Sequence, residues 1–132
     1  MSKKHNTEGR TIIPSESRIQ QDIVRWYRNQ YCLKHQSPRS MIFSIPNEGR
    51  GMQSAALIAT GLYAGMADLC VIHHKGNIHD GYTKTILFIE VKNALGAQGS
   101  KQFEFEDHCV SMGITYKLVR SLSEFRGVVE GL

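Results

Sequence analysis

The order of helical and strand-like segments constrains the fold of this chain more than any other feature. Four short apolar runs have strand character, and helical segments surround them in the order α-β-(α)-β-β-α-β-α. This order fits a small mixed sheet with helices on both faces, which makes the chain an α/β or α+β protein. The predicted strands cover residues 41–45, 68–73, 85–92 and 114–119, and the predicted helices cover residues 16–31, 52–60, 100–112 and 122–129.

The first predicted helix begins after Pro14-Ser15 and has a clear apolar stripe. Its members recur at helical spacing, which indicates a face packed on the core. They are Ile19, Ile23, Trp26 and Tyr27. We therefore expect the Trp26 and Tyr27 rings to pack in the core rather than to stack on nucleic-acid bases.

The polar segment 74–84 contains two glycines and predicts a hairpin-type loop between the second and third strands. His73, His74 and His79 lie in or beside it and share no ligand set, so we expect exposed polar side chains and no metal site. In the third long helix, Phe105, Cys109 and Met112 are predicted to share one packed face.

The length of 132 residues fits one domain, with a loose basic tail over residues 1–13 and a folded part over residues 14–132. The 41% of hydrophobic and 21% of charged residues exclude a disordered chain. No apolar run approaches the roughly 20 residues of a membrane span. The three cysteines, Cys32, Cys70 and Cys109, are odd in number and widely spaced, which predicts free thiols in the cytoplasm.

The positive charge is concentrated in the first part of the chain. Residues 1–50 hold nine Lys and Arg against four Asp and Glu, for a net charge of +5, whereas residues 51–132 have a net charge of −1. This asymmetry suggests a polyanionic partner on one side, although an ordinary solvated surface stays open as an alternative. Gly49-Arg50-Gly51 lacks the Gly-Lys-Ser/Thr of a Walker loop, so no nucleotide cofactor is expected.

The segment Ile89-Glu90-Val91-Lys92 adds two charged side chains to the end of an otherwise apolar strand. Because side chains alternate across a strand, Glu90 and Lys92 project from one face. Burying such charges is costly without a partner or a function. Asp68 stands at the start of the preceding strand, and hairpin pairing would bring it to the same end as Glu90, so that both converge on one cation. Two hard oxygen ligands, with no sulfur and no evident histidine, favour Mg²⁺ or Mn²⁺ over zinc.

These residues resemble the PD-(D/E)xK nuclease superfamily, whose restriction-endonuclease-like αβββαβ core carries Asp, Glu and Lys at these places. The resemblance narrows to the VRR-NUC family, the virus-type replication-repair nucleases, and covers about residues 15–120. Five stretches in the family's order carry it. They are Glu16-Ser17 with Gln20, Pro46-Asn47 with Gly49-Arg50, Gly61 with Gly65-Met66-Ala67-Asp68-Leu69, Glu90-Val91-Lys92, and Ser100 with Gln102, Phe105 and Gly113.

The resemblance implies a site for metal-assisted phosphodiester hydrolysis. Asp68 and Glu90 would bind Mg²⁺ or Mn²⁺, and the backbone carbonyl of Val91 would be a third ligand. Glu16 would reach from the first helix to a second metal ion or to its water shell.

The resemblance also implies roles for Lys92 and Gln102. Lys92 would orient or help to deprotonate the attacking water, and Gln102 would hydrogen-bond near Lys92 or a phosphate. From the residues alone, simpler interpretations stay open. Glu90 and Lys92 could form a surface ion pair of little energetic value, Glu16 could be a first-turn acid favoured by the helix dipole, and Gln102 could be a solvated helix residue.

The implied activity is that of a structure-specific DNA endonuclease of the stand-alone phage or bacterial type. A four-way (Holliday) junction has two symmetric scissile phosphates, so its resolution by this chain implies a homodimer. The alternatives are a nuclease for flaps, single strands or plain duplex, and a non-catalytic DNA-binding module. Contacts to the DNA backbone are expected from Arg18, Arg25, Arg28, Arg39, Arg50 and Lys101.

Overall fold

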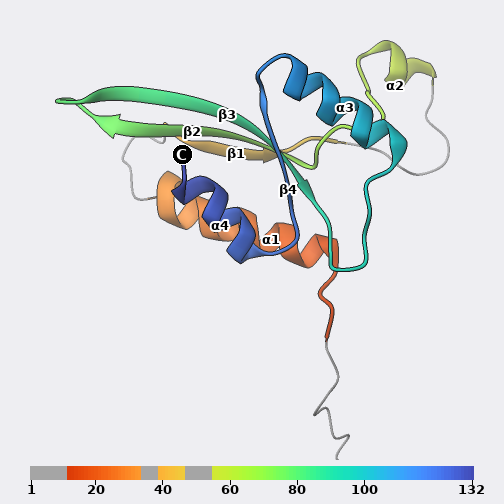
Figure 1. Ribbon diagram of the computed structural model, residues 1–132, viewed down its shortest axis with the longest axis horizontal. Coiled ribbons are helices and arrows are strands. Elements are labelled where there is room, and N and C mark those ends of the chain that lie inside the picture. Colours follow the sequence, from red (N-terminus) through yellow and green to blue (C-terminus); the bar gives the residue numbers. More distant parts are fainter. Residues whose placement is uncertain (1–11, 34–38, 47–54) are drawn as a thin grey trace, which may run out of the picture.

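The computed structural model describes residues 12–33, 39–46 and 55–132. Its centre is a four-stranded mixed sheet in which the strands stand in chain order, β1-β2-β3-β4 (Figure 1). β1 pairs antiparallel with β2, β2 pairs antiparallel with β3, and β3 pairs parallel with β4. The strands are β1 (Met41–Ser44), β2 (Leu69–Asn77), β3 (Gly81–Val91) and β4 (Thr115–Val119).

Helices cover both faces of the sheet, as Figure 1 shows. The helices are α1 (Glu16–Tyr27), followed by a π-helical turn η1 (Arg28–Cys32), then α2 (Ala55–Ala59), α3 (Ser100–Ser111) and α4 (Leu122–Glu130). α1 and α4 lie side by side against one face, and α3 lies on the other face. The mixed α/β class and the predicted order of elements are therefore confirmed.

The two faces of the sheet carry two separate cores. The larger core lies between the sheet and α1 with α4, and its buried residues are Ile19, Ile23, Tyr27, Ile42, Leu69, Val71, Leu87, Ile89, Val91, Val119, Phe125 and Val129. The smaller core lies under α3 and consists of Ala67, Phe105, Cys109 and Tyr116. Side chains alternate along β3, so Phe88 and Glu90, which stand between the core residues Leu87, Ile89 and Val91, face the smaller core.

α1 begins where Ser15 caps it, because the Ser15 hydroxyl accepts a hydrogen bond of 3.1 Å from the backbone N–H of Arg18. Ile19, Ile23 and Tyr27 of the apolar stripe are buried as predicted. Trp26 is half-buried and packs edge-on against Phe125 of α4. The helical signal that reaches Tyr31 is also real, but the last part is the wider π-helical turn η1.

The predicted loop over residues 74–84 is wrong in its length. β2 continues to Asn77 and β3 already begins at Gly81, so the two strands form a long ladder that extends beyond both cores. Backbone pairing satisfies the strands there while their side chains face solvent, so polar composition does not indicate a loop. The Asn77 side-chain oxygen closes the turn by accepting hydrogen bonds from the backbone N–H groups of His79 (2.9 Å) and Asp80 (2.8 Å).

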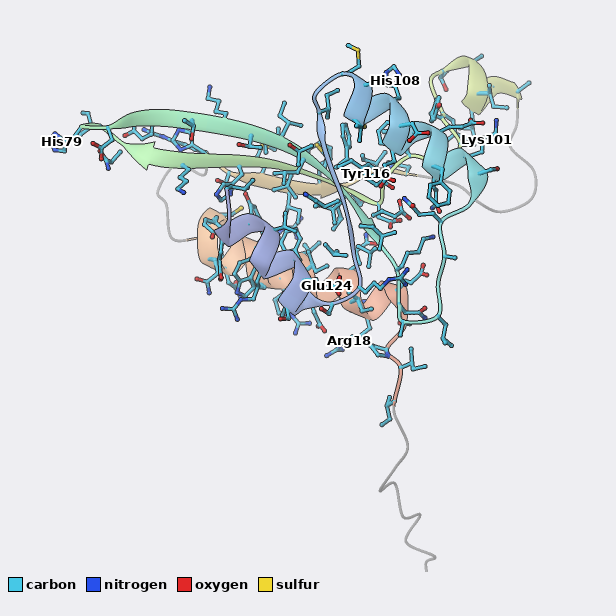
Figure 2. All side chains as sticks on the ribbon, viewed as in Figure 1. Arg18, His79, Lys101, His108, Tyr116 and Glu124 are labelled. Atoms are coloured by element: carbon cyan, nitrogen blue, oxygen red, sulfur yellow. The ribbon has the colours of Figure 1, made fainter. Side chains whose placement is uncertain are left out.

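The prediction that His73 is an exposed polar residue is also wrong. His73 is 4% exposed, and its Nδ1 lies 2.9 Å from the Tyr27 hydroxyl oxygen. It shares a strand face with Leu69 and Val71, so its ring points into the space under α1. Burial lowers the pKa of His73. His79 is exposed at the far tip of the β2–β3 hairpin, as predicted (Figure 2).

Phe105 and Cys109 are buried as predicted, but Met112 is 64% exposed. Met112 is the C-cap of α3, and Gly113 with a φ of +71° turns the chain away directly after it. Cys70 and Cys109 are buried free thiols, and Cys32 is a half-buried one.

Three predicted features lie outside the described residues. They are nearly all of the tail 1–13, the glycine-rich turn with Arg50, and the first residues of the helix predicted over 52–60. Within the part of the chain that the structure describes, every helix is too short or too polar to cross a membrane.

Candidate active site

Asp68 and Glu90 face each other across the β2–β3 pair. Leu69 is the register partner of Ile89, so the preceding residue of one strand lies opposite the next residue of the other. Leu69 and Ile89 belong to the larger core. The two carboxylates therefore lie on the opposite face, toward α3. This is the arrangement expected from the sequence, in which hairpin pairing brings Asp68 and Glu90 to the same end of the two strands.

The Glu90 carboxylate is 1% exposed and has two polar neighbours on one oxygen. Its Oε1 accepts a hydrogen bond of 2.8 Å from Gln102 Nε2 and lies 3.5 Å from Lys92 Nζ. Among the described residues, its other oxygen, Oε2, is buried without a hydrogen-bond partner. A buried carboxylate oxygen with no partner is costly, so this oxygen marks a position where a further donor or cation would be stabilising.

Asp68 is held in place by the neighbouring strand. Its Oδ2 accepts a hydrogen bond of 2.7 Å from the backbone N–H of Val91. Its own backbone carbonyl accepts from the N–H of Ile45, at 2.9 Å, just after β1. Asp68 is thus fixed to β3 by its side chain and to the β1 side of the sheet by its backbone.

Glu90 and Asp68 both bind a proton more tightly than ordinary carboxyl groups do. Burial, and after it the neighbouring Asp68 carboxylate, raise the pKa of Glu90 to about 8, although the Lys92 ammonium opposes the shift. Burial likewise raises the pKa of Asp68, against the lowering effect of the Val91 N–H. Two carboxyl groups with raised pKa on one buried face have a surplus of negative charge that a cation would relieve.

The side chains of Glu16 and Lys92 both pass close to Gly96. A Cβ atom on Gly96 would lie 2.6 Å from Glu16 Oε1 and 3.2 Å from Lys92 Cδ, so both side chains pass close to this residue. The Lys92 side chain is 12% exposed. Glu16 contributes to raising the pKa of Asp68, which agrees with its position at the same end of the sheet.

The loop that carries Gly96 is fixed by two residues that the sequence reasoning missed. Arg120 Nη1 donates hydrogen bonds of 2.7 Å to the carbonyl oxygens of Asn93 and Gly96. The Asn93 side-chain oxygen accepts from the N–H groups of Leu95 (3.1 Å) and Gly96 (2.9 Å). Asn and Gly three positions apart are a signal for a turn. Nothing in the sequence links that turn to Arg120, which lies 24 residues after Gly96.

Gln102 connects the start of α3 to the carboxylates. Its Oε1 accepts a hydrogen bond of 2.9 Å from the backbone N–H of Gly99, which caps the helix, and its Nε2 donates to Glu90. The first contact fixes the orientation of the amide, so that the N–H₂ group points at the carboxylate. Gln102 lies beside Glu90 and, through it, near Lys92.

A groove of about 750 Å³ opens beside the carboxylates, with Glu16 and Asp68 in its wall. Phe43 and Ser44 of β1 line one side of it. The other side is formed by residues of α1 and η1 that follow one another at intervals of four along two ridges. They are Glu16, Gln20, Val24 and Arg28 on one ridge and Ser17, Gln21, Arg25 and Asn29 on the other.

The basic residues expected to contact DNA fall into different regions. Arg25 and Arg28 line the groove. Arg18 forms an exposed ion pair with Asp22, with 3.3 Å between Nε and Oδ1. Lys101 stands exposed at the start of α3, on the other side of the sheet from Arg18 (Figure 2).

Two further basic candidates are not part of this group. The Arg39 guanidinium carbon lies 4.8 Å from the ring centre of Tyr82 on the β2–β3 hairpin, away from the carboxylates. Arg50 lies outside the described residues.

The donor set fits a hard divalent cation in part. Within residues 12–33, 39–46 and 55–132, no group of three or more His, Cys, Asp and Glu side chains is arranged to hold a metal ion. The candidate ligands are two carboxylates, one of which has a buried oxygen without a partner. Mg²⁺ needs only one or two protein carboxylates, because it keeps several waters and takes phosphate oxygens.

No protein-family model matches the sequence, and no curated protein matches it. Two solved structures resemble the fold. One is described as "VRR_NUC domain protein", with a TM-score of 0.67 and 19% identity over 90% of this chain and 88% of the other. The second is described as "VRR_NUC domain", with a TM-score of 0.55 and 19% identity over 87% of this chain and 94% of the other. The chain therefore has the fold of VRR_NUC domain proteins, which the sequence resemblance predicted.

Proposed function

We propose that the chain is a Mg²⁺- or Mn²⁺-dependent deoxyribonuclease that hydrolyses phosphodiester bonds at the Asp68–Glu90 pair. The observation that carries this proposal is the buried Glu90 carboxylate, which faces Asp68 and has one oxygen without a partner among the described residues. A divalent cation would supply that partner and offset the repulsion between the two carboxylates. The likeness of the fold to VRR_NUC domain structures supports a nuclease over other metal-dependent enzymes.

In this proposal, Asp68 and Glu90 hold the cation, together with the backbone carbonyl of Val91. A bound Mg²⁺ or Mn²⁺ acts as a Lewis acid and activates water for in-line displacement. The chain's own contribution is to fix the ligands. The Val91 N–H orients Asp68, and Gln102 Nε2 orients Glu90.

The Lys92 ammonium supplies positive charge next to this pair, with its Nζ at 3.5 Å from Glu90 Oε1. In the proposed reaction it orients the attacking water and neutralises the charge that develops on the scissile phosphate. Glu16 passes close to Gly96, as the stem of Lys92 does, and we assign Glu16 to the water shell of the metal site.

The proposed substrate is branched DNA. Resolution of a four-way junction needs two cuts related by a two-fold axis, so it requires a homodimer in which each copy supplies one site. The groove beside Asp68 favours a second candidate, cutting at a flap or another unpaired strand, because a groove with Arg25 and Arg28 in its wall would accommodate one unpaired strand next to the site.

A cleavage assay tests the proposal. Labelled four-way junction, flap, single strand and linear duplex are incubated with Mg²⁺ or Mn²⁺, and with EDTA as the metal-free reference. We expect Lys92→Met and Asp68→Asn to lower the cleavage rate by at least about 100-fold, because each removes a charge that acts on the reacting phosphate or its metal. Lys117→Met and Asp107→Asn remove exposed charges of the same type and should cut like the wild type.

The products distinguish the substrates. Paired symmetric cuts on the junction alone identify a dimeric resolvase, whereas cuts confined to the flap or single strand identify a nuclease for unpaired strands. Equal cutting of all four substrates would support nuclease activity and contradict specificity for a DNA structure. DNA binding without cleavage by the wild type, at any Mg²⁺ or Mn²⁺ concentration, would contradict the proposal and favour a non-catalytic DNA-binding module.

A further inference from the structure

The groove between α1 and β1 is built differently at its two ends. Glu16 and Asp68 stand at one end, where the candidate active site lies, and Arg25 and Arg28 stand toward the other. Along α1 the distance from Glu16 to Arg28 is about 18 Å, from a rise of 1.5 Å per residue. The groove thus joins an acidic end, suited to a cation, to a basic end, suited to an anion.

Arg25 and Arg28 are available for a ligand. Both are exposed residues on adjacent ridges of the helix, three positions apart, which makes their side chains neighbours on its surface. Among the described residues, the ion pair of α1 joins Arg18 to Asp22 and involves neither groove arginine. Two adjacent guanidinium groups are well suited to phosphate oxygens.

The remaining lining suits the other parts of a nucleotide. Gln21 and Asn29 provide amide groups that can donate and accept hydrogen bonds. Phe43 is 41% exposed in the opposite wall and offers a ring face for base stacking.

The size of the groove sets the form of the DNA. Its volume of about 750 Å³ falls in the range of roughly 300–1,000 Å³ typical of sites for drug-sized molecules. Such a space takes a few nucleotides of one strand, whereas a duplex is far too wide for it.

We infer that this groove binds an unpaired DNA strand that leads away from the scissile phosphate, with Arg25 and Arg28 holding its phosphates. The inference rests on the proposed nuclease function and specifies its substrate: DNA with a single-stranded segment next to the cut. Fully paired DNA then reaches the carboxylates without occupying the groove, and it is bound more weakly.

The test measures binding apart from cleavage. Fluorescence anisotropy in EDTA follows the full chain binding to a labelled oligothymidylate of about 12 nucleotides, a length within the usual site sizes of single-strand binders, and to a blunt duplex. The variant Arg25→Gln/Arg28→Gln is compared with Lys117→Gln/Arg126→Gln, which removes two charges from β4 and α4 outside the groove. Circular dichroism checks that both pairs fold.

We expect Arg25→Gln/Arg28→Gln, the groove pair, to bind the oligothymidylate at least about tenfold more weakly than the wild type at moderate salt. The slope of log affinity against log salt should become less steep by about 1.4, or 0.7 for each lost phosphate contact. Duplex binding should change little, and Arg25→Lys/Arg28→Lys should recover most of the affinity because it restores the charge. An equal loss in the control pair, or an equal loss for strand and duplex, would overturn the inference.

The inference and the nuclease proposal fail in different ways. If the wild type cuts DNA and Arg25→Gln/Arg28→Gln binds the single strand as well as the wild type does, the groove inference is wrong and the nuclease proposal stands. If Arg25→Gln/Arg28→Gln loses single-strand binding but the wild type never cuts DNA, the nuclease proposal is wrong and the groove inference stands.

Discussion

At the scale of single residues, Glu90 is the position where burial and charge repulsion oppose ionisation most strongly. It is a carboxylate with 1% exposure, it faces a second carboxylate, and it has one ammonium group at 3.5 Å. One ammonium does not offset the loss of hydration of a buried carboxylate beside the half-buried Asp68 carboxylate, which is why burial and Asp68 dominate the pKa of Glu90. The protonation of Glu90 should therefore control the stability of the metal-free protein.

We expect the metal-free protein to lose stability as pH rises. The pKa of Glu90 is raised from 4.5 to about 8, so the folded protein holds a proton that the unfolded chain has released between these values. The associated stability is fully present below about pH 4.5 and is lost as pH rises through about 8, by an amount on the order of 5 kcal/mol. Urea unfolding at pH 5 and pH 8 in EDTA measures it.

Glu90→Gln should remove most of this pH dependence and make the protein more stable at pH 8, because it removes the buried charge. Glu104→Gln, on the exposed face of α3, serves as the control and should leave the dependence unchanged. Parallel pH profiles for the wild type and Glu90→Gln would show that Glu90 ionises normally in the folded protein.

A second residue, Gly96, should separate stability from activity. An alanine Cβ there would lie 2.6 Å from Glu16 Oε1, which is the end of a flexible side chain and can move away. We expect Gly96→Ala to change the free energy of unfolding by less than about 1 kcal/mol while slowing cleavage, since the added methyl group pushes the Glu16 carboxylate out of its place beside Gly96. Gly127→Ala, where the added Cβ has open space, should leave cleavage unchanged. Wild-type cleavage by Gly96→Ala would exclude a role for the position of Glu16.

At the scale of elements, the sequence predicts what depends on local periodicity. Alternation along β3 separates Leu87, Ile89 and Val91 from Glu90 and Lys92, and hairpin pairing is enough to bring Asp68 opposite Glu90. The structure has both features. These relations need only the strand repeat and one antiparallel pairing, so they survive errors in the exact ends of the strands.

The features that were not predicted depend on contacts between distant segments. The β2–β3 ladder extends past the core as a polar hairpin, where hydrophobic alternation no longer marks a strand. His73 is buried because a hydroxyl of α1 meets it. The closeness of Glu16 to Gly96 depends on the loop that Arg120 holds from the turn between β4 and α4. None of these contacts leaves a periodic signal in the sequence.

The contact between the segment before β2 and α3 gives an element-scale prediction. Gly65 has a φ of +89°, and a Cβ there would lie 2.5 Å from the backbone carbonyl carbon and oxygen of Lys101. We expect Gly65→Ala to destabilise the protein by about 3 kcal/mol or more, since backbone atoms cannot move aside and α3 must shift.

Gly61→Ala is the matched control for Gly65→Ala. Its φ is +109°, but an added Cβ meets nothing within 4 Å, so only the backbone strain of about 1 kcal/mol remains. Denaturant unfolding of both variants gives the difference. Equal losses in the two variants would mean that α3 does not depend on close packing against Gly65.

At the scale of the whole molecule, charge and shape are aligned. The net charge of +5 in residues 1–50 includes Arg25 and Arg28, which line the groove that starts at the carboxylates. The composition of the first part of the chain suggested a polyanionic partner. The groove specifies where such a partner would lie, because its charged residues change from acidic to basic along α1. In the proposed binding mode the strand makes few phosphate contacts, and these are assigned to named residues.

The number of these contacts predicts how strongly salt weakens binding. Arg25, Arg28 and Lys92 give about three phosphate contacts on one strand, which corresponds to a slope of log affinity against log salt near −2.1. Affinity for a single strand should then fall about 20-fold between 50 and 200 mM salt. Anisotropy titrations of the wild type at four salt concentrations measure the slope, and Arg25→Gln/Arg28→Gln should reduce it to about −0.7 because one contact remains. A flat response in the wild type would mean that binding does not depend on phosphate contacts. A slope much steeper than −2.1 would mean that further basic residues, beyond these three, touch the strand.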